Sequence, residues 1–240
     1  MTNKVSEIDA LVLCGGMGTR LRSVIGERQK VAAEVDGRPL LSIQLERLAK
    51  QGVEHVVLAA GFGAAQIKEA ADQNNFGLKI DISVEPQPLG TGGAMKHARA
   101  LARGKKWIIM NGDCLFDISF ADLLRFHDER RSLVTLSVCS RDDAQDYGTV
   151  EFDPQYRITA FREKEKDRTT GFVSVGLYCF EQKAFDLMPA KEKFSIETDF
   201  FPHILDEQVF AYPASSGFLD IGTPDRFQQA RKELGKEGCQ

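Results

Sequence analysis

The stretch "IDALVLCGGMGTRL", residues 8–21, determines the fold that we expect for this chain. Its first half is a continuous apolar run of strand length, and Gly15, Gly16 and Gly18 follow at the end of that run. A buried strand that ends in glycines can bring bare backbone N–H groups against a ligand, because glycine places no side chain in the way. The stretch therefore predicts an α/β protein with a ligand site at the carboxyl end of this strand.

Further apolar runs of strand length alternate with helical patterns through the first 140 residues. In the first helical segment, Pro39 lies near the start and Gly52 at the end, as is typical of helix boundaries. Strict alternation predicts βαβ units and a mostly parallel sheet with helices on both faces. Strands are expected at 8–14, 54–61, 78–85, 107–113 and 132–139, and helices at 38–52, 64–75, 92–104 and 120–131.

From about residue 145 the pattern changes to alternating strands without long helices between them. Strands are expected at 147–153, 157–165, 171–180 and 208–213, with a helix at 182–188 and a last helix opened by Pro224. The fold expected is a Rossmann-like three-layer α/β/α arrangement with a central, mostly parallel mixed sheet and a small antiparallel subregion. No internal repeat or low-complexity linker interrupts the sequence, so residues 1–240 are expected to form a single domain with two halves, about 1–140 and about 141–240.

Composition and charge exclude several classes of protein. The formal net charge is −4 over 240 residues, so no global basic field favours nucleic acid or an anionic membrane surface. No apolar run has the length of a transmembrane helix, and the first ten residues lack the apolar core of a signal peptide. The five cysteines are an odd number without metal-ligand spacing, which is typical of free thiols in a reducing compartment. We therefore expect a cytoplasmic protein.

The glycine loop does not match the two best-known phosphate-binding patterns. The P-loop needs Gly-Lys-Ser/Thr, but this chain has Gly18-Thr19-Arg20. The dinucleotide pattern, counted from Gly16, would need glycine where Leu21 stands. Glycines alone are equally compatible with a tight strand-to-helix turn. The guanidinium of Arg20 favours a ligand, because a planar fork of donors matches phosphate oxygens, and the loop is interpreted as a triphosphate cradle.

The segment Gly15–Leu21, with Lys30 ten residues after Arg20, resembles the signature of the sugar-1-phosphate nucleotidyltransferases. That family usually has proline before the lysine, whereas this chain has Gln29, which would leave the loop more mobile. The short length and motif details are most similar to the D-glycero-α-D-manno-heptose 1-phosphate guanylyltransferases. Similar segments continue in the family's order at 85–98, 111–118, 147–153, 161–164 and 218–227.

The resemblance implies nucleotidyl transfer between small-molecule substrates. An oxygen of the sugar 1-phosphate attacks the α-phosphorus of a nucleoside triphosphate, and pyrophosphate leaves. GTP and D-glycero-α-D-manno-heptose 1-phosphate are the favoured pair, which would give GDP-heptose for surface polysaccharide such as capsule or lipopolysaccharide. A mannose-1-phosphate guanylyltransferase and an amino-sugar-1-phosphate uridylyltransferase remain alternatives. The oligomeric state is open, and a homodimer is compatible with the sequence.

The resemblance also assigns the reacting centre. Arg20, Lys30 and Asp113 are the expected catalytic residues, with Arg20 on the β- and γ-phosphates and Lys30 between the donor and acceptor phosphates. Asp113 and Asp220 are the expected ligands of Mg²⁺, since hard carboxylate oxygens suit that ion. The alternative for Asp113 is a turn residue that follows a strand. Asp117 is interpreted as a helix-entry or turn residue outside the site.

The remaining site residues divide between the two substrates. Glu85 is expected to bind the base, because a carboxylate can accept hydrogen bonds from both N1–H and the 2-amino group of guanine; it could instead be held by a neighbouring backbone amide. Ser174 stands where the family usually has asparagine. The expected nucleotide-binding residues are Leu13, Gly15, Gly16, Gly18, Thr19, Arg20, Glu85, Gly90, Thr91, Asn111 and Asp113, and the expected sugar-phosphate-binding residues are Lys30, Gly148, Glu163, Lys164 and Ser174.

Several of these residues permit other interpretations. Glu163 and Lys164 could be solvated charges in a segment rich in both types. Glu197 and Asp199 could face the sugar or cap a helix. A catalytically silent binding subunit would be expected to lack the arginine, the lysine or a metal aspartate, and all are present. A glycosyltransferase is disfavoured because the strand-end motif is not Asp-x-Asp, and the chain ends too soon after 218–227 for an appended β-helix.

Overall fold

A computed structural model describes residues 5–16, 18–35, 37–144, 147–162, 169–214 and 218–237 of the chain. Within these ranges, nine strands form one mixed sheet in which β10, β9, β11, β6, β1, β4 and β5 follow one another, while β8 pairs with β11 and β12. The strands of this sheet are β1 (Asp9–Leu13), β4 (His55–Ala60), β5 (Lys79–Val84), β6 (Lys106–Asn111), β8 (Val134–Arg141), β9 (Thr149–Phe152), β10 (Ile158–Arg162), β11 (Gly171–Glu181) and β12 (Val209–Pro213).

Parallel and antiparallel pairing divide this sheet. β1 runs parallel to β4 and β6, and β4 runs parallel to β5, as the alternating sequence pattern predicts. β11 is antiparallel to β6, β8 and β9, and β9 is antiparallel to β10. The expected antiparallel subregion is therefore a continuation of the central sheet, and the three-layer α/β/α expectation is confirmed.

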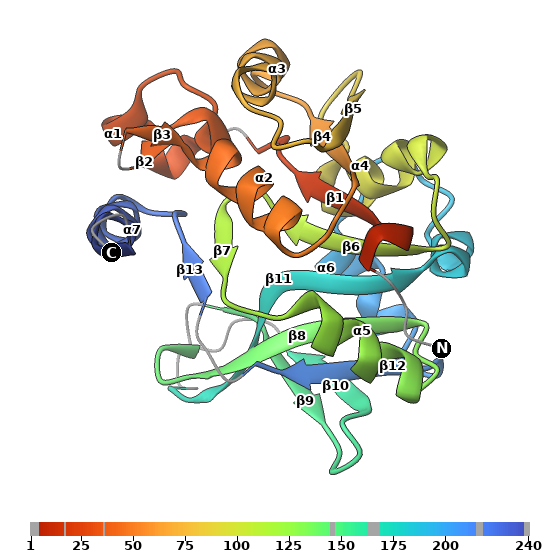
Figure 1. Cartoon of the computed structure of the whole chain (residues 1–240). Helices are drawn as coiled ribbons and strands as arrows, with labels where there is room; N and C mark the ends of the chain where they lie inside the picture. Colours follow the sequence, from red (N-terminus) through yellow and green to blue (C-terminus); the bar gives the residue numbers. More distant parts are fainter. Residues whose placement is uncertain are drawn as a thin grey trace.

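Helices cover both faces of the sheet. One apolar layer joins β1 and β4 to α2, α3 and α5, and the other joins the opposite strand faces to α4, α6 and η6. Figure 1 shows α2 and α5 in front of the sheet and α6 behind it. The helices are α1 (Arg22–Ile25), α2 (Leu40–Lys50), α3 (Ala64–Gln73), α4 (Gly90–Ala98), α5 (Phe120–Glu129), α6 (Ile196–Asp199) and α7 (Pro224–Glu237), with 3₁₀ turns η1 (Val5–Glu7), η2 (Thr19–Leu21), η3 (Lys30–Ala32), η4 (Arg99–Leu101), η6 (Gln182–Leu187) and η7 (Phe201–His203).

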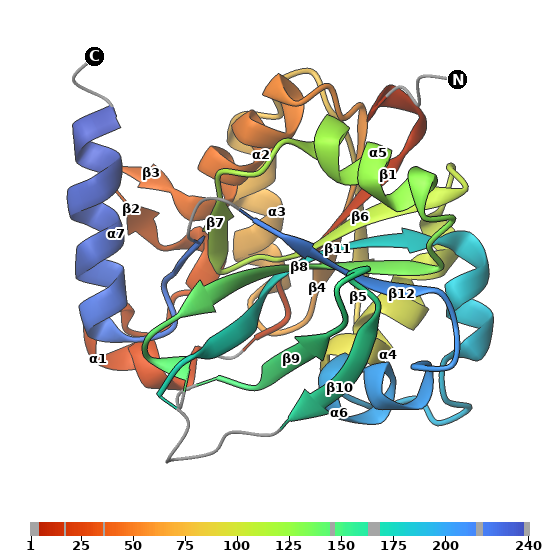
Figure 2. The same cartoon turned by 90° about the horizontal axis from the view of Figure 1, so that it is seen from below.

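Several elements differ from the sequence pattern. The helix expected at 182–188 is the 3₁₀ turn η6, and two short strand pairs were not foreseen: β2 (Glu34–Val35) with β3 (Arg38–Pro39), and β7 (Cys114–Phe116) with β13 (Phe218–Asp220). Strands of two or three residues are too short to show an alternation of apolar and polar residues. In Figure 2, α7 stands at one side of the molecule beside β2 and β3. Phe227 of α7 is buried in a small apolar cluster there.

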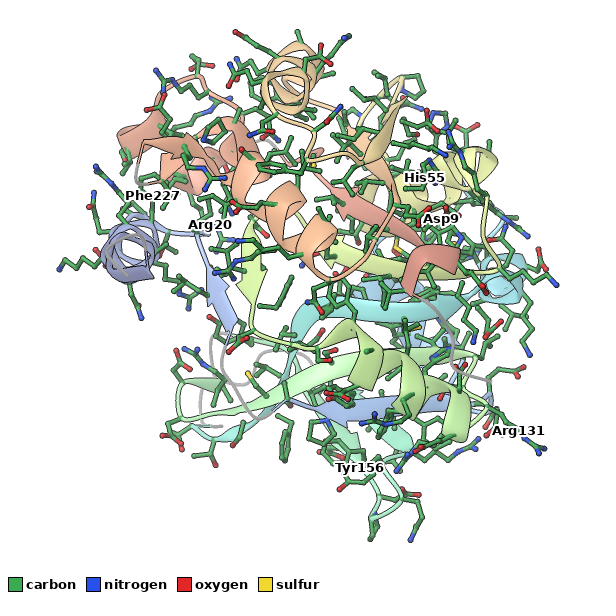
Figure 3. All side chains as sticks on the ribbon, in the orientation of Figure 1. Asp9, Arg20, His55, Arg131, Tyr156 and Phe227 are labelled. Carbon is green, nitrogen blue, oxygen red and sulfur yellow. The ribbon has the colours of Figure 1, made fainter. Side chains whose placement is uncertain are left out.

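A charged network lies at the amino ends of β1, β4 and their neighbours, on the edge of the sheet where these strands begin. His55 Nδ1 is 2.5 Å from an oxygen of the buried Asp9, and His55 Nε2 is 2.9 Å from Asp81. Figure 3 shows Asp9 and His55 side by side. The hydrogen bond from His55 lowers the pKa of Asp81. Hydrogen bonds through His55 therefore tie Asp9 of β1 to Asp81 of β5 at this edge.

No helix among the described residues combines the length and the apolar character needed to cross a membrane.

Candidate active site

Two cavities open at the edge where the parallel strands end. The glycine-loop cavity, of about 360 Å³, lies between the segment after β1 and the start of α4. The antiparallel-strand cavity, of about 570 Å³, lies over β9, β10 and β11. Asn111, the last residue of β6, and Asp113 line both cavities. Two ligands bound in these cavities would therefore meet at Asp113.

Three glycines, Gly15, Gly16 and Gly90, line the glycine-loop cavity. A Cβ on Gly15 would overlap Glu85 Oε1, and a Cβ on Gly61 would lie 3.3 Å from the Cα of Gly15. The loops after β1 and β4 thus approach each other more closely than side chains would allow. Of the expected nucleotide-binding residues, this cavity is lined by Leu13, Gly15, Gly16, Glu85, Gly90, Thr91, Asn111 and Asp113.

Glu85 follows β5 and is fixed in the floor of this cavity. The backbone N–H of Leu89 donates to Glu85 Oε2 over 2.8 Å, and the N–H of Glu85 donates to the carbonyl of Ala60 over 2.8 Å. Burial raises the pKa of Glu85, although the hydrogen bond from Leu89 opposes the shift. Oε1 faces Gly15, so the carboxylate keeps acceptor capacity toward the cavity.

Gly18 turns the chain away from the glycine-loop cavity. Its φ of 59° lies in the left-handed region, and the 3₁₀ turn η2 begins at the next residue, Thr19. The turn carries Arg20 into the lining of the antiparallel-strand cavity. Figure 3 shows Arg20 on the side of the molecule that α7 occupies. Gly18, Thr19 and Arg20 are therefore outside the lining of the glycine-loop cavity, in which they were expected to bind nucleotide.

Lys30 and Asp113 form an ion pair between the two cavities. The Lys30 side chain is 10% exposed, lines the glycine-loop cavity and donates to Asp113 Oδ2. The thiol of Cys114 donates to Asp113 Oδ1 over 3.3 Å. Burial, followed by the charge of Asp113, raises the pKa of Cys114, so this thiol stays protonated. Both oxygens of Asp113 thus have a neighbouring donor.

Gln44 of α2 fixes the backbone on both sides of Asp113, a role that the sequence did not indicate. Its Nε2 donates to the carbonyl of Gly112 over 2.8 Å and to that of Cys114 over 2.9 Å. The N–H of Gly112 in turn donates to the carbonyl of Leu13 over 2.9 Å. Because Gln44 is 1% exposed, these bonds are protected from water. The Asp113 turn is therefore anchored to β1 and α2 together.

The short pair β7–β13 brings Asp220 to the same place. Asp220 lies opposite Cys114 in this pair, and the N–H of Ile221 donates to the carbonyl of Asp113 over 2.9 Å. Asp220 Oδ2 accepts hydrogen bonds from Arg226 Nη1 over 2.9 Å and from the Tyr147 hydroxyl over 3.0 Å. Two carboxylates far apart in sequence thus line one cavity.

The two carboxylates, Asp113 and Asp220, fit Mg²⁺ better than a metal ion that takes all of its ligands from protein side chains. In the part of the chain that the structure describes, no group of three or more His, Cys, Asp or Glu side chains could hold a metal ion. Asp113 and Asp220 would supply carboxylate oxygens, and each now neighbours a protein cation, Lys30 and Arg226 respectively. Mg²⁺ is commonly bound by one or two carboxylates together with water and substrate phosphates.

The antiparallel-strand cavity contains Gly148 and Ser174 of the expected sugar-phosphate site. Ser174 Oγ accepts a hydrogen bond from the N–H of Gly176 over 3.3 Å. Gly176 has φ 73° and no room for a side chain, because a Cβ there would overlap the amide of Asn111. Glu163 and Lys164, which were also expected in this site, lie outside the described residues.

Thr91 links the two cavities instead of facing only one. Its hydroxyl donates to Glu197 Oε2 over 2.8 Å and accepts from the N–H of Ile196 over 2.9 Å. Glu197 lines the antiparallel-strand cavity. Asp199 accepts from the N–H of Ser195 over 2.8 Å and from Lys191, so it holds the start of α6 rather than facing the cavity. The starts of α4 and α6 are therefore tied together.

Charged and aromatic residues complete the antiparallel-strand cavity, and the sequence did not single them out. Arg162 of β10, Arg226 of α7 and Tyr147 all line it. Burial, and next the charge of Asp220, raise the pKa of Tyr147, so its hydroxyl remains a donor. Arg226 Cζ lies 4.9 Å from the centre of the Tyr147 ring. Arg226 stood within the segment 218–227 that resembled the family, which was the one available signal.

Comparisons with known proteins identify the family of the chain. A model of the family described as "Nucleotidyl transferase" matches residues 9–237. The mannose-1-phosphate guanylyltransferase of Mycobacterium tuberculosis is 35% identical over 95% of this chain, which spans 65% of that protein. The D-glycero-α-D-manno-heptose 1-phosphate guanylyltransferase of Aneurinibacillus thermoaerophilus is 34% identical over 95% of this chain and 98% of its own. The crystal structure of HddC from Yersinia pseudotuberculosis complexed with GMP-PN is 31% identical, with a TM-score of 0.84 over 95% of this chain and 99% of that one.

Proposed function

The chain belongs to the nucleotidyl transferase family and is a sugar-1-phosphate nucleotidyltransferase, and we propose that it transfers GMP from GTP to D-glycero-α-D-manno-heptose 1-phosphate. The products would be GDP-heptose and pyrophosphate. Family membership rests on the match over residues 9–237. The choice of GTP and of a heptose phosphate is supported by the relatives named for that reaction and by the chemistry of Glu85.

The observation that carries the proposal is the meeting of the two cavities at Asp113. A triphosphate in the glycine-loop cavity would place its α-phosphorus near Lys30, at the boundary with the antiparallel-strand cavity. A sugar phosphate in the second cavity could then approach from the opposite side of the α-phosphorus. Such positioning lowers the barrier of a transfer between two anions, because it replaces a bimolecular encounter by a fixed approach.

Electrostatics account for the remaining chemistry. The attacking phosphate oxygen is already anionic, so no general base is needed. A divalent cation held by Asp113 and Asp220 would neutralise charge on the phosphates. Lys30 would move from Asp113 toward the α-phosphate, and Arg20 would stabilise charge from the other cavity. In this proposal residues about 1–140 bind the nucleotide and about 141–240 bind the sugar phosphate.

Glu85 supports guanine as the base. A carboxylate offers about four lone-pair positions, so the bond from Leu89 leaves acceptor capacity for two guanine donors. Guanine presents N1–H and a 2-amino group side by side, whereas uracil presents one donor on the corresponding edge. Two parallel charge-assisted bonds would thus favour GTP over UTP.

A second candidate keeps the donor and changes the acceptor. The relative of Mycobacterium tuberculosis named as a mannose-1-phosphate guanylyltransferase is as similar as the heptose-specific relative, at 35% and 34% identity. Mannose 1-phosphate is therefore the acceptor to compare directly with the heptose phosphate. The two sugars share the ring and the anomeric phosphate, so discrimination would fall on the part of the antiparallel-strand cavity away from Asp113.

The test measures pyrophosphate release with Mg²⁺ for each nucleoside triphosphate and each sugar 1-phosphate. We expect GTP with the heptose phosphate to give the highest kcat/KM. ITP, which lacks the 2-amino group, should lose about ten- to a hundredfold, because one carboxylate acceptor is left without its partner. Glu85→Gln is the matched variant and should narrow the difference between GTP and ITP. Equal turnover of UTP and GTP would contradict the choice of guanine as the base. A higher kcat/KM with mannose 1-phosphate than with the heptose phosphate would identify mannose 1-phosphate as the acceptor.

A further inference from the structure

Gln29 has the backbone conformation of a proline without being one. Its φ of −66° lies within the range that a proline ring imposes, and its ψ of 137° is that of extended backbone. The related enzymes usually have proline here, and its absence was expected to leave the loop more mobile. The side chain of Gln29 is instead buried, with 1% of the residue exposed. The position therefore keeps the φ that a proline would have, although its side chain is a buried amide.

The side chain of Gln29 lines the glycine-loop cavity and holds the carbonyls of the glycine loop. Its Nε2 donates to the carbonyl of Cys14 and, over 3.4 Å, to that of Gly16, while its Oε1 accepts from the N–H of Val31 over 2.5 Å. In a trans peptide the C=O and the following N–H point in opposite directions. A carbonyl of Cys14 held toward Gln29 therefore turns the N–H of Gly15 away from it.

The backbone of Gln29 makes a bond that proline could not make. Its N–H donates to Gln66 Oε1 of α3 over 2.6 Å. Gly63, which precedes α3, leaves the space for this approach, because a Cβ there would lie 2.7 Å from the Cβ of Gln29. The segment that carries Lys30 is thus fastened both to the glycine loop and to α3.

We propose that Gln29 is a positioning residue for the triphosphate. Its carboxamide fixes two carbonyls of the glycine loop, so that the N–H of Gly15 is presented to phosphate oxygens, and it fixes the 3₁₀ turn from which Lys30 extends. Gln29 acts through the loop and through Lys30, and it takes no part in the reaction itself. The inference rests on the proposed function in taking a nucleoside triphosphate as the ligand of this cavity.

Three substitutions separate the contributions of the Gln29 carboxamide and of the Gln29 N–H to binding of the triphosphate. Gln29→Met keeps the length of the side chain and removes the amide donors. Gln29→Pro restores the family's residue and keeps φ, but it removes both the carboxamide and the N–H that donates to Gln66. Gln66→Leu is the matched control, because it removes only the acceptor on α3 and leaves the carboxamide bonds in place.

The first measurement is the Kd of the α,β-methylene analogue of GTP with Mg²⁺, whose α–β bond the reaction cannot break. We expect about a tenfold increase for Gln29→Met and Gln29→Pro, since the three hydrogen bonds of the carboxamide are lost, and less than a threefold change for Gln66→Leu. The KM of the sugar 1-phosphate should stay within about twofold of wild type. Unchanged analogue affinity in Gln29→Met, or an equal loss for both substrates, would overturn the proposal.

A pH profile of Gln29→Glu distinguishes positioning from simple packing. The introduced carboxylate would face two carbonyl oxygens and would repel them, whereas its protonated form can again donate a hydrogen bond. Affinity for the analogue should therefore recover as the pH is lowered, relative to wild type at each pH. A constant ratio across pH would contradict the inference.

Inorganic triphosphate with Mg²⁺ separates this inference from the choice of nucleotide. The probe carries no base, so its binding does not depend on Glu85. If wild type binds triphosphate and Gln29→Met binds it about tenfold more weakly, the inference holds even if GTP is not the donor. If the two proteins bind triphosphate equally well, the inference fails even if GTP is turned over.

Discussion

The two cavities of the site are built from different material. The glycine-loop cavity lies at the ends of β1, β5 and β6, beside the point where Gly15 and Gly61 approach each other without side chains. The antiparallel-strand cavity is formed by side chains, with arginines from η2, β10 and α7. A cavity that depends on a close approach of glycines is damaged by added atoms, whereas a cavity lined by arginines is damaged by their removal. Substitutions can therefore test each cavity separately.

The boundary between the cavities should give the largest effect, because Asp113 lines both. Asp113→Asn replaces the carboxylate beside Lys30 with a neutral amide and weakens the proposed cation site. We expect kcat to fall on the order of a thousandfold, as several kcal/mol of charge stabilisation are lost. Removal of divalent cations by a chelator should cause a similar loss in wild type.

Thermal unfolding is the control for this variant. The amide is similar in size to the carboxylate, and Gln44 still holds the flanking carbonyls, so Tm should change little. Full activity in the presence of the chelator would contradict the assignment of Asp113 and Asp220 to a cation.

An added methyl group should affect the glycine-loop cavity alone. In Gly15→Ala the new Cβ would overlap Glu85 Oε1, so either the loop or Glu85 must move. We expect KM for the nucleoside triphosphate to rise about ten- to a hundredfold, given the usual cost of overpacking. Gly16→Ala is the matched control, because nothing lies within 4 Å of a Cβ there. Equal effects of the two substitutions would show that backbone clearance does not set affinity.

Loss of a guanidinium should affect the antiparallel-strand cavity alone. Arg226→Ala removes a cation from this cavity and from Asp220 Oδ2, which keeps the hydroxyl of Tyr147 as a donor. We expect KM for the sugar 1-phosphate to rise about tenfold, in keeping with a partly solvated charge. Arg226→Lys retains the charge and should recover part of this loss. A larger change in nucleotide affinity than in the KM of the sugar phosphate would contradict the assignment of the two substrates to separate cavities.

The smallest effect concerns pH. Burial raises the pKa of Glu85, so the carboxylate proposed to bind guanine is lost at a higher pH than for an exposed glutamate. Affinity for the GTP analogue should weaken a few-fold as the pH falls from about 7 to about 5. Glu85→Gln is the reference at each pH, since the ratio cancels protonation of the ligand. A pH-independent ratio would indicate that Glu85 does not bind the base.

The effect of Glu85 on stability should depend on pH in the opposite direction to its effect on binding of the GTP analogue. A raised pKa means that the folded state holds the proton more firmly than the unfolded chain does. The contribution of Glu85 to stability is therefore present at low pH and is lost as the pH rises through the folded pKa. Above that pH, Glu85→Gln should unfold at a slightly higher temperature than wild type.

The sequence predicted the glycine-loop cavity better than its partner. Strand ends and glycines are local features, and Gly15, Gly16 and Asp113 could be assigned from them and from the family resemblance. Gln44 could not be assigned, because a glutamine within an amphipathic helix has no local pattern that distinguishes it from a surface residue. Arg226 lay in the family-like segment 218–227, but nothing local indicated that it contacts Asp220. Their partners lie about 70 residues away for Gln44, and at the end of a three-residue strand for Arg226.

Gln29 illustrates the same limit at a single position. Its departure from the family's proline was visible, but the outcome depended on the carbonyls of Cys14 and Gly16 and on Gln66 of α3. Substitution tables compare side chains one position at a time, whereas this glutamine is compatible with the loop because Gly63 leaves space for it.

The pairing of β13 with β7 also has a consequence for the order of synthesis. On the ribosome, the segments that form the glycine-loop cavity emerge before residue 115, whereas Asp220 and Arg226 emerge about a hundred residues later. The N–H groups of Gly92 and Gly93 in α4, however, donate to the carbonyl of Phe194, and β6 pairs with β11. The glycine-loop cavity therefore takes its final shape only when the second half of the chain has been synthesised, and the same late segments complete both cavities.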